Sequence, residues 1–193
     1  MVGRKSLDAW IRLYALQNVL LALLALVLAE GERHLVLAGV ALLLIKGVFI
    51  PRYLFWLLER LGISHEVESY LSIPLSLLLG GVLVAVGFRV GSSFVLEGAR
   101  LPEAVPVALG LILLGMLSMA SRKKAVTQVL GFLALENGVF LLALAETHGL
   151  PLFIELGVAL DAFAAVVLAG VLISRIQSTF GHIDTARMRD LKG

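Results

Sequence analysis

The sequence of 193 residues contains no cysteine and only four histidines. Without cysteine, the chain has no disulfides, no iron–sulfur ligation and no thiolate metal sites of its own. The histidines are far apart and lie near the ends of apolar stretches, so no metal-ligand spacing connects them. Any redox cofactor would therefore have to be bound by another polypeptide.

Charge is scarce as well, at 16% of residues against 60% hydrophobic residues and a mean hydropathy of +0.99. A soluble domain of this size could not cover so much apolar surface with so few charges. The net charge of +2 does not indicate a nucleic-acid partner, because the basic residues form no stripe interleaved with aromatic residues. The charges lie in short clusters between long apolar stretches, which predicts an all-α integral membrane protein.

Several apolar stretches are long enough to cross a hydrocarbon core roughly 30 Å thick. The predicted spans cover residues 9–29, 35–57, 70–89, 103–120, 126–146 and 152–174. Together they predict one bundle of six transmembrane helices over residues 1–175, followed by a polar tail over residues 176–193.

Basic residues concentrate on one side of this predicted bundle. The N-terminal side has Arg4, Lys5, Arg12, Arg52, Arg60, Arg122, Lys123, Lys124, Arg175, Arg187, Arg189 and Lys192, and the other side has Arg33, Arg89 and Arg100. An even number of spans places both termini on one side. The excess of positive charge predicts that this side is cytoplasmic.

Polar residues early in the chain have conventional explanations. Trp10, Arg12 and Tyr14 suit the membrane interface, and we expect Gln17 and Asn18 to form hydrogen bonds between helices, although a functional role stays open. In the second span, Pro51 lacks an N–H and predicts a kink about one turn before it.

Lys46 is less easily explained, because it lies about 11 residues into the second span, near the predicted midplane. Its side chain would reach the interface only marginally by snorkelling. The alternative is a functional or ion-paired role within the bundle.

Two carboxylates lie deep in the last two predicted spans. Glu136 and Asp161 each fall about midway along their helix, where an ionisable group costs roughly 2.5–3.5 kcal/mol to insert. An antiparallel hairpin through the turn at residues 146–151 would place both at similar depth. Buried carboxylates near a cation such as Lys46 are typical of proton relays, and the alternative is ion pairs that only fix the bundle.

Three neighbouring residues have weaker indications. Glu155 lies in the first turn of the sixth span, where either the helix dipole or a role as an outer proton group would explain it. Asn137 is expected to form hydrogen bonds between helices, and Gly138 to allow a neighbouring helix to approach closely.

The stretches LALENGVFLLAL, PLFIELGVALDAF and STFGHIDTARMRDLKG resemble the component E family of hydrogenase-4, a membrane subunit of group 4 [NiFe] hydrogenases and formate hydrogenlyase-like complexes. The resemblance is specific from about Gly131 onward. Earlier spans match mainly in hydropathy and in the spacing of Lys46 and Pro51. The last spans are also similar to the K subunit of complex I and the C subunit of multisubunit Na⁺/H⁺ antiporters.

Those relatives carry two intramembrane glutamates on consecutive helices. Glu136 falls on the first position and Asp161 on the second, where this chain has the shorter aspartate. The resemblance implies a non-catalytic subunit of a redox-driven, ion-translocating complex in a prokaryotic inner membrane. The resemblance makes Glu136 and Asp161 the relay residues, and we expect Lys46 to act as a modulating cation and Glu155 as an outer proton group.

The implied partners are antiporter-like and complex I-like membrane subunits and a peripheral hydrogenase arm, within a hetero-oligomer in the lipid bilayer. Nickel–iron and iron–sulfur clusters would be bound by those partners, and this chain would hold no cofactor. Two alternatives are a purely structural subunit of such a complex and a separate small ion transporter. A transporter would more often show paired repeats with broken helices, which the sequence lacks.

Overall fold

The computed structural model describes residues 7–29, 33–61, 69–94, 99–123 and 125–146, together with 163, 165–167, 169, 170 and 173. Its elements are α1 (Leu7–Leu28), α2 (Arg33–Leu42), the π-helix η1 (Leu43–Phe49), α3 (Ile50–Leu61), α4 (Ile73–Gly91), α5 (Ala104–Ser121) and α6 (Ala125–Glu146). In these residues the only extended pairing is an isolated bridge between Ser69 and Arg122. The predicted all-α fold is confirmed for this part of the chain.

Among the described residues, five helices are long and apolar enough to cross a membrane. They cover Leu7–Leu28, Leu35–Glu59, Ile73–Gly91, Ala104–Ser121 and Val126–Ala145, and the second of them runs through α2, η1 and α3. Most of the predicted sixth span and all of the tail lie outside the described residues.

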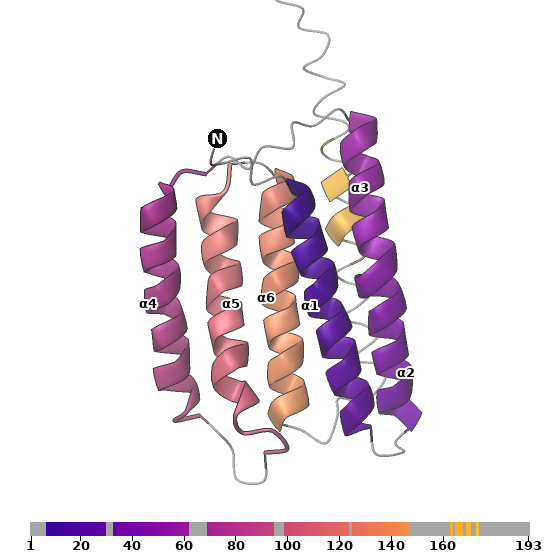
Figure 1. The fold of residues 1–193 in the computed structure, drawn as a ribbon, viewed down its shortest axis with the longest axis vertical. Helices are drawn as coiled ribbons and strands as arrows, with labels where there is room; N and C mark the ends of the chain where they lie inside the picture. Colours follow the sequence, from indigo (N-terminus) through magenta and orange to yellow (C-terminus); the bar gives the residue numbers. More distant parts are fainter. Residues whose placement is uncertain are drawn as a thin grey trace, which may run out of the picture.

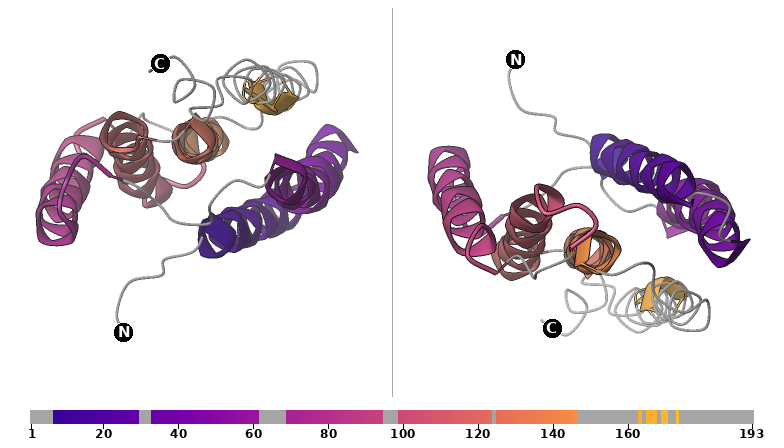
Figure 2. Two further views of the ribbon diagram at one scale, coloured as in Figure 1. Left: turned by 90° about the horizontal axis from the view of Figure 1, so that it is seen from above. Right: turned by 90° about the horizontal axis from the view of Figure 1, so that it is seen from below.

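The helices alternate in direction, with α1, α4 and α6 running one way and α5 and the α2–η1–α3 helix the other (Figure 1). Seen along their axes, α4, α5 and α6 form a row, and α1 lies with the α2–η1–α3 helix beside one end of that row (Figure 2). Of the described helices, only α5 packs against α4, so α4 stands at the edge of this part of the bundle.

Small residues bring α5 and α6 into close contact. A Cβ atom added to Gly115 would lie 2.5 Å from the backbone nitrogen of Leu135, and one added to Gly138 would lie 2.8 Å from that of Ile112. No real side chain fits at those distances, so only glycine allows this backbone approach. The expected close approach at Gly138 is confirmed.

Two apolar clusters fill the interface between α1 and its neighbours. The first joins the N-terminal half of α1 to α3 and α6 through Leu7, Ile11, Tyr14, Ile50, Leu54, Leu58, Val126, Leu130, Leu133, Val166 and Ile173. The second joins the C-terminal half of α1 to α2, α5 and α6 through Leu21, Ala22, Ala25, Ala29, Leu35, Leu42, Ala108, Phe140, Leu141 and Leu144. Between the two clusters, α1 contributes Asn18 and α6 contributes Glu136 and Asn137, all of them buried. A polar layer therefore crosses the middle of the bundle.

Loop residues hold the helix ends together. On one side, the Arg100 guanidinium donates to the Leu28 carbonyl and the Leu101 amide donates to the Ala145 carbonyl, 3.0 Å away. Both contacts satisfy carbonyl groups in the last turn of a helix, which have no partner within the helix itself. On the other side, the Arg122 guanidinium lies 4.7 Å from the centre of the Trp10 ring.

The α5–α6 contact gives a first prediction. Gly115→Ala should destabilise the chain by about 1–3 kcal/mol, because the new methyl group would overlap the backbone of Leu135. Gly81→Ala is the matched control, since nothing lies within 4 Å of a Cβ atom at that position. Thermal unfolding of both variants in nanodiscs measures the difference. Equal midpoints would mean that α5 and α6 do not pack this closely.

Candidate functional site

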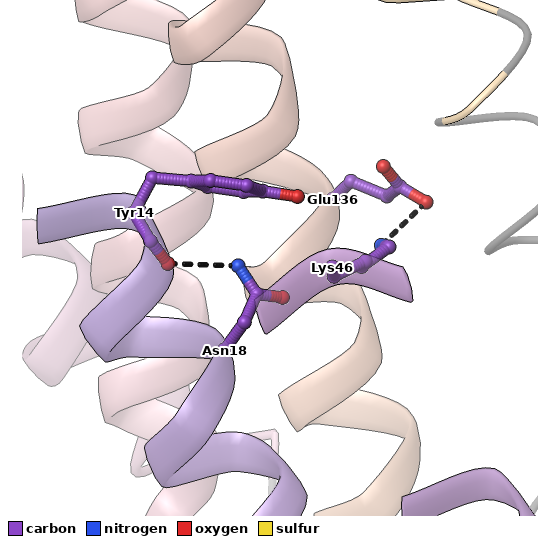
Figure 3. Close-up of polar contacts among 4 residues, drawn as sticks. All are labelled: Tyr14, Asn18, Lys46 and Glu136. Atoms are coloured by element: carbon purple, nitrogen blue, oxygen red, sulfur yellow. Dashed lines mark hydrogen bonds and ion pairs between the residues drawn. The ribbon is translucent and has the colours of Figure 1, made fainter. Parts of the chain in front are cut away.

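Lys46 and Glu136 form an ion pair in the middle of the bundle. The Nζ atom of Lys46 lies 2.8 Å from Oε1 of Glu136, and the two residues are 0% and 8% exposed (Figure 3). The two residues are 90 positions apart in the sequence, so the fold brings the two charges together. The expected pairing of Lys46 with a buried carboxylate is present in the structure.

Both members of the pair lie at mid-depth of their spans. Lys46 is 11 residues after Leu35 and 13 before Glu59, and Glu136 is ten after Val126 and nine before Ala145. At about 1.5 Å per residue, each charge is therefore some 15 Å from either end of its helix. Water from either surface does not reach that depth without a path, so each charge depends on the other.

The π-helix η1 presents Lys46 to α6. The amide of Ile50 donates to the carbonyl of Ile45, a five-residue hydrogen bond in place of the usual four-residue one. Pro51 follows at once and has no N–H, so a carbonyl one turn earlier loses its donor and the regular α-helical pattern is interrupted. The predicted irregularity before Pro51 thus takes the form of a π-helical turn, a feature often found at functional sites.

Tyr14 and Asn18 of α1 lie beside the ion pair. Tyr14 is 4% exposed, and its hydroxyl points toward Glu136 (Figure 3). The amide of Asn18 donates to the Tyr14 carbonyl at 2.8 Å. The expectation that Tyr14 lies at the membrane interface is wrong, because α1 turns this residue inward. Asn18 was expected to bond to another helix, and its amide bonds within α1.

A pattern in the sequence marks these two residues as buried. Tyr14 and Asn18 continue the three- and four-residue spacing of Leu7, Ile11, Leu21 and Ala25, all of them on the buried stripe of α1. Gln17 falls outside that stripe. It lies at the edge of an apolar groove of about 380 Å³ between α1, α4 and α5.

Asn137 follows Glu136 and is fully buried, but no hydrogen bond reaches either atom of its amide. Tyr14 Oη and Asn18 Oδ1 also lack a hydrogen-bond partner in the described part of the chain. The expected bond from Asn137 to another helix is therefore not made within the described residues. Each buried polar group left in this state costs about 1–3 kcal/mol.

Two of the predicted relay residues, Glu155 and Asp161, lie outside the described residues. The described residues nearest to them pack on the helix that carries Lys46. The Phe163 ring lies 5.4 Å from that of Phe49, and a Cβ atom on Gly170 would lie 2.9 Å from the Tyr53 hydroxyl. The sixth predicted span thus contacts η1 and α3 at these points.

The chemistry of this site is that of charge pairing and proton exchange. Across the described residues, no three His, Cys, Asp or Glu side chains lie close enough together to hold a metal ion. Lysine and glutamate side chains can each gain or lose a proton, and either event would break the pair. The layer can therefore exist in at least two charge states.

Comparison with known proteins gives two kinds of relative. The chain is 34% identical over 200 residues to Rv0085 of Mycobacterium tuberculosis, described as an uncharacterized protein, and the match covers 100% of this chain and 89% of that protein. The chain belongs to the Rv0085 family. It is also 25% identical over 188 residues to hydrogenase-4 component E of Escherichia coli K12 and Shigella flexneri, covering 93% of this chain and 85% of those proteins.

The relation to hydrogenase-4 component E is distant, but it extends across most of the chain. The match therefore includes the first four spans, where the sequence resemblance rested mainly on hydropathy. No family model and no solved structure matches the chain.

The energy of the ion pair can be tested by a double-mutant cycle. Lys46→Met or Glu136→Gln alone should each destabilise the chain, by up to about 3–5 kcal/mol, because each leaves an uncompensated buried partner. The double variant should lose much less than the sum of the two. Thermal unfolding of the four proteins in nanodiscs gives the coupling energy, and strictly additive losses would show that the two charges do not interact.

Proposed function

We propose that this chain is a non-catalytic subunit in the membrane arm of a complex I-related [NiFe] hydrogenase, and that its buried carboxylates carry protons. The observation that supports this most is the Lys46–Glu136 pair at the middle of two spans. The distant homology to hydrogenase-4 component E supplies the class of complex. The chain would work as one of several subunits in a prokaryotic inner membrane, with both termini in the cytoplasm.

Division of labour in such a complex follows from the residues present. A chain without cysteine cannot ligate an iron–sulfur cluster or a nickel–iron centre through thiolates. Electron transfer and hydrogen chemistry are therefore assigned to a peripheral arm and its partner subunits. This chain would contribute charged groups that respond to the redox reaction, next to antiporter-like and complex I-like membrane subunits.

The proposed relay begins at Glu136. While Lys46 is protonated, the carboxylate is held in its charged form by a contact of 2.8 Å. Removing or displacing that positive charge leaves a carboxylate in an apolar layer, where its neutral form is favoured, so it takes up a proton. When the positive charge returns, the proton is released. Asp161 and, nearer the outer surface, Glu155 would accept it in turn.

A purely structural role is the second candidate, and the short contact itself is compatible with it. Energetic considerations favour the relay, because a buried ion pair is a poor source of stability. Desolvation of two charges often cancels their attraction, and apolar residues of similar volume hold a bundle at least as well. An ion pair used only for assembly would therefore stabilise the bundle little more than two leucine side chains at the same positions.

The proposal is tested by separating proton transfer from assembly. Glu136→Gln in the assembled complex should leave subunit composition and hydrogen turnover intact but reduce protons moved per hydrogen several-fold, because glutamine cannot exchange a proton. Asp161→Asn should act in the same direction. Proton movement is followed with a pH-sensitive dye in proteoliposomes, with and without Na⁺ to identify the ion.

Glu59→Gln is the matched control, since Glu59 is an exposed carboxylate on α3 and lies outside the polar layer. It should leave proton movement unchanged. Normal pumping by an assembled Glu136→Gln complex would refute the relay and support the structural role. Because Glu136→Gln alone leaves Lys46 uncompensated, assembly is also measured in the double variant with Lys46→Met, and failure of that double variant to assemble would favour the structural role.

A further inference from the structure

Four buried polar atoms in the layer of the ion pair make no hydrogen bond of normal geometry in the described part of the chain. They are Tyr14 Oη, Asn18 Oδ1, and Nδ2 and Oδ1 of Asn137. Asn18 and Asn137 are 0% exposed and Tyr14 is 4% exposed, so lipid and surface water do not reach them. Native proteins leave few such atoms unsatisfied, and a bilayer core offers none of the compensation that bulk water gives.

Both asparagines lie between the two apolar clusters that α1 and α6 share. Leu133 of α6 belongs to the same apolar cluster as Tyr14 of α1, and Leu141 belongs to the same cluster as Ala22. Helices α1 and α6 run in the same direction (Figure 1), and Asn18 and Asn137 each fall between these residues along their helix. Residues four apart share a helix face, so Asn137 lies on the face of α6 that carries Leu133 and Leu141.

The chemistry of these atoms selects the ligand. Asn18 Oδ1 only accepts hydrogen bonds, Asn137 Nδ2 only donates them, and the Tyr14 hydroxyl does both. An anion would be repelled by Glu136 and by the free oxygen of Asn18, and a cation by Lys46 and the Asn137 amide. A neutral molecule that both donates and accepts hydrogen bonds can bond to each of these atoms. Buried water is such a molecule, and it typically makes about three hydrogen bonds.

We infer that Tyr14, Asn18 and Asn137 form a water-binding site next to the Lys46–Glu136 ion pair. The Tyr14 hydroxyl points toward Glu136 (Figure 3), so Tyr14 is a neighbour of both the ion pair and Asn18 of the proposed site. If the proposed function holds, the bound water would accept a proton from Glu136 or donate one to it. The binding of water itself does not depend on that role.

Asn137→Leu tests the site, because leucine has nearly the shape of asparagine but cannot bind water. If water occupies the site, Asn137→Leu removes hydrogen-bond partners of that water. The thermal midpoint of the full chain in nanodiscs should then fall by about 2–4 °C. If the site is dry, removing an unsatisfied amide should raise the midpoint instead. Gln17→Leu is the matched control, since Gln17 faces the groove and not the polar layer, and its midpoint should stay unchanged.

A second measurement detects the water directly. Infrared difference spectra of the unmodified chain between two pH values, recorded in H₂¹⁶O and H₂¹⁸O, should show isotope-sensitive O–H bands that disappear in Asn137→Leu and persist in Gln17→Leu. Absence of such bands in the unmodified chain, or a raised midpoint in Asn137→Leu, overturns the water site. Both readouts are independent of proton pumping. The water site can therefore be confirmed when the relay is refuted, and the relay can be confirmed when the water site is refuted.

Discussion

The absence of water from a bilayer core is the constraint on which this structure depends, and the Lys46–Glu136 ion pair is its clearest consequence. A charge buried some 15 Å from either surface has to be compensated by the protein itself. The contact of 2.8 Å does this, and it requires η1 and α6 to lie side by side at one level. Apolar clusters above and below the pair keep the layer closed, so α1, α6 and the second span are held in a fixed register.

The second span carries the local irregularity that the pair requires. A regular α-helix cannot continue unchanged through Pro51, and here the interruption falls on the turn that contains Lys46. A π-helical turn alters which side chains face a neighbouring helix, because it contains one more residue than an α-helical turn. The proline that disrupts the backbone and the lysine that needs a partner are therefore parts of one feature. Sequence spacing indicated the disruption, but not the kind of helix that results.

How far the sequence predicted the site depends on which property each residue reveals. Hydropathy and helical rise placed Lys46 and Glu136 at similar depth, since depth is a one-dimensional property that residue counting measures. Residue counting does not measure rotation about the helix axis. Tyr14 was therefore assigned to the interface, because it lies near the end of an apolar stretch. Its burial follows from a stripe on α1 that only packing against α6 and η1 makes inward. Asn137 was expected to find a partner, yet whether one lies within reach depends on distances of tenths of an ångström. Asp161 and Glu155 stay predictions.

Within the described residues the polar layer is asymmetric, because Glu136 has a cation on one side and a neutral hydroxyl toward α1. Toward α1, the Tyr14 hydroxyl points toward Glu136, and a hydroxyl can pass a proton on without holding a net charge. Toward the C-terminal part of the chain, Phe163 contacts Phe49, three residues after Lys46, and Asp161 precedes Phe163 by only two positions. In the proposed relay, Asp161 would be the second acid that competes with Glu136 for the positive charge of Lys46. A purely structural ion pair needs one stable partner for each charge. Two carboxylates that share one lysine can take turns as its partner, and a relay requires such an exchange.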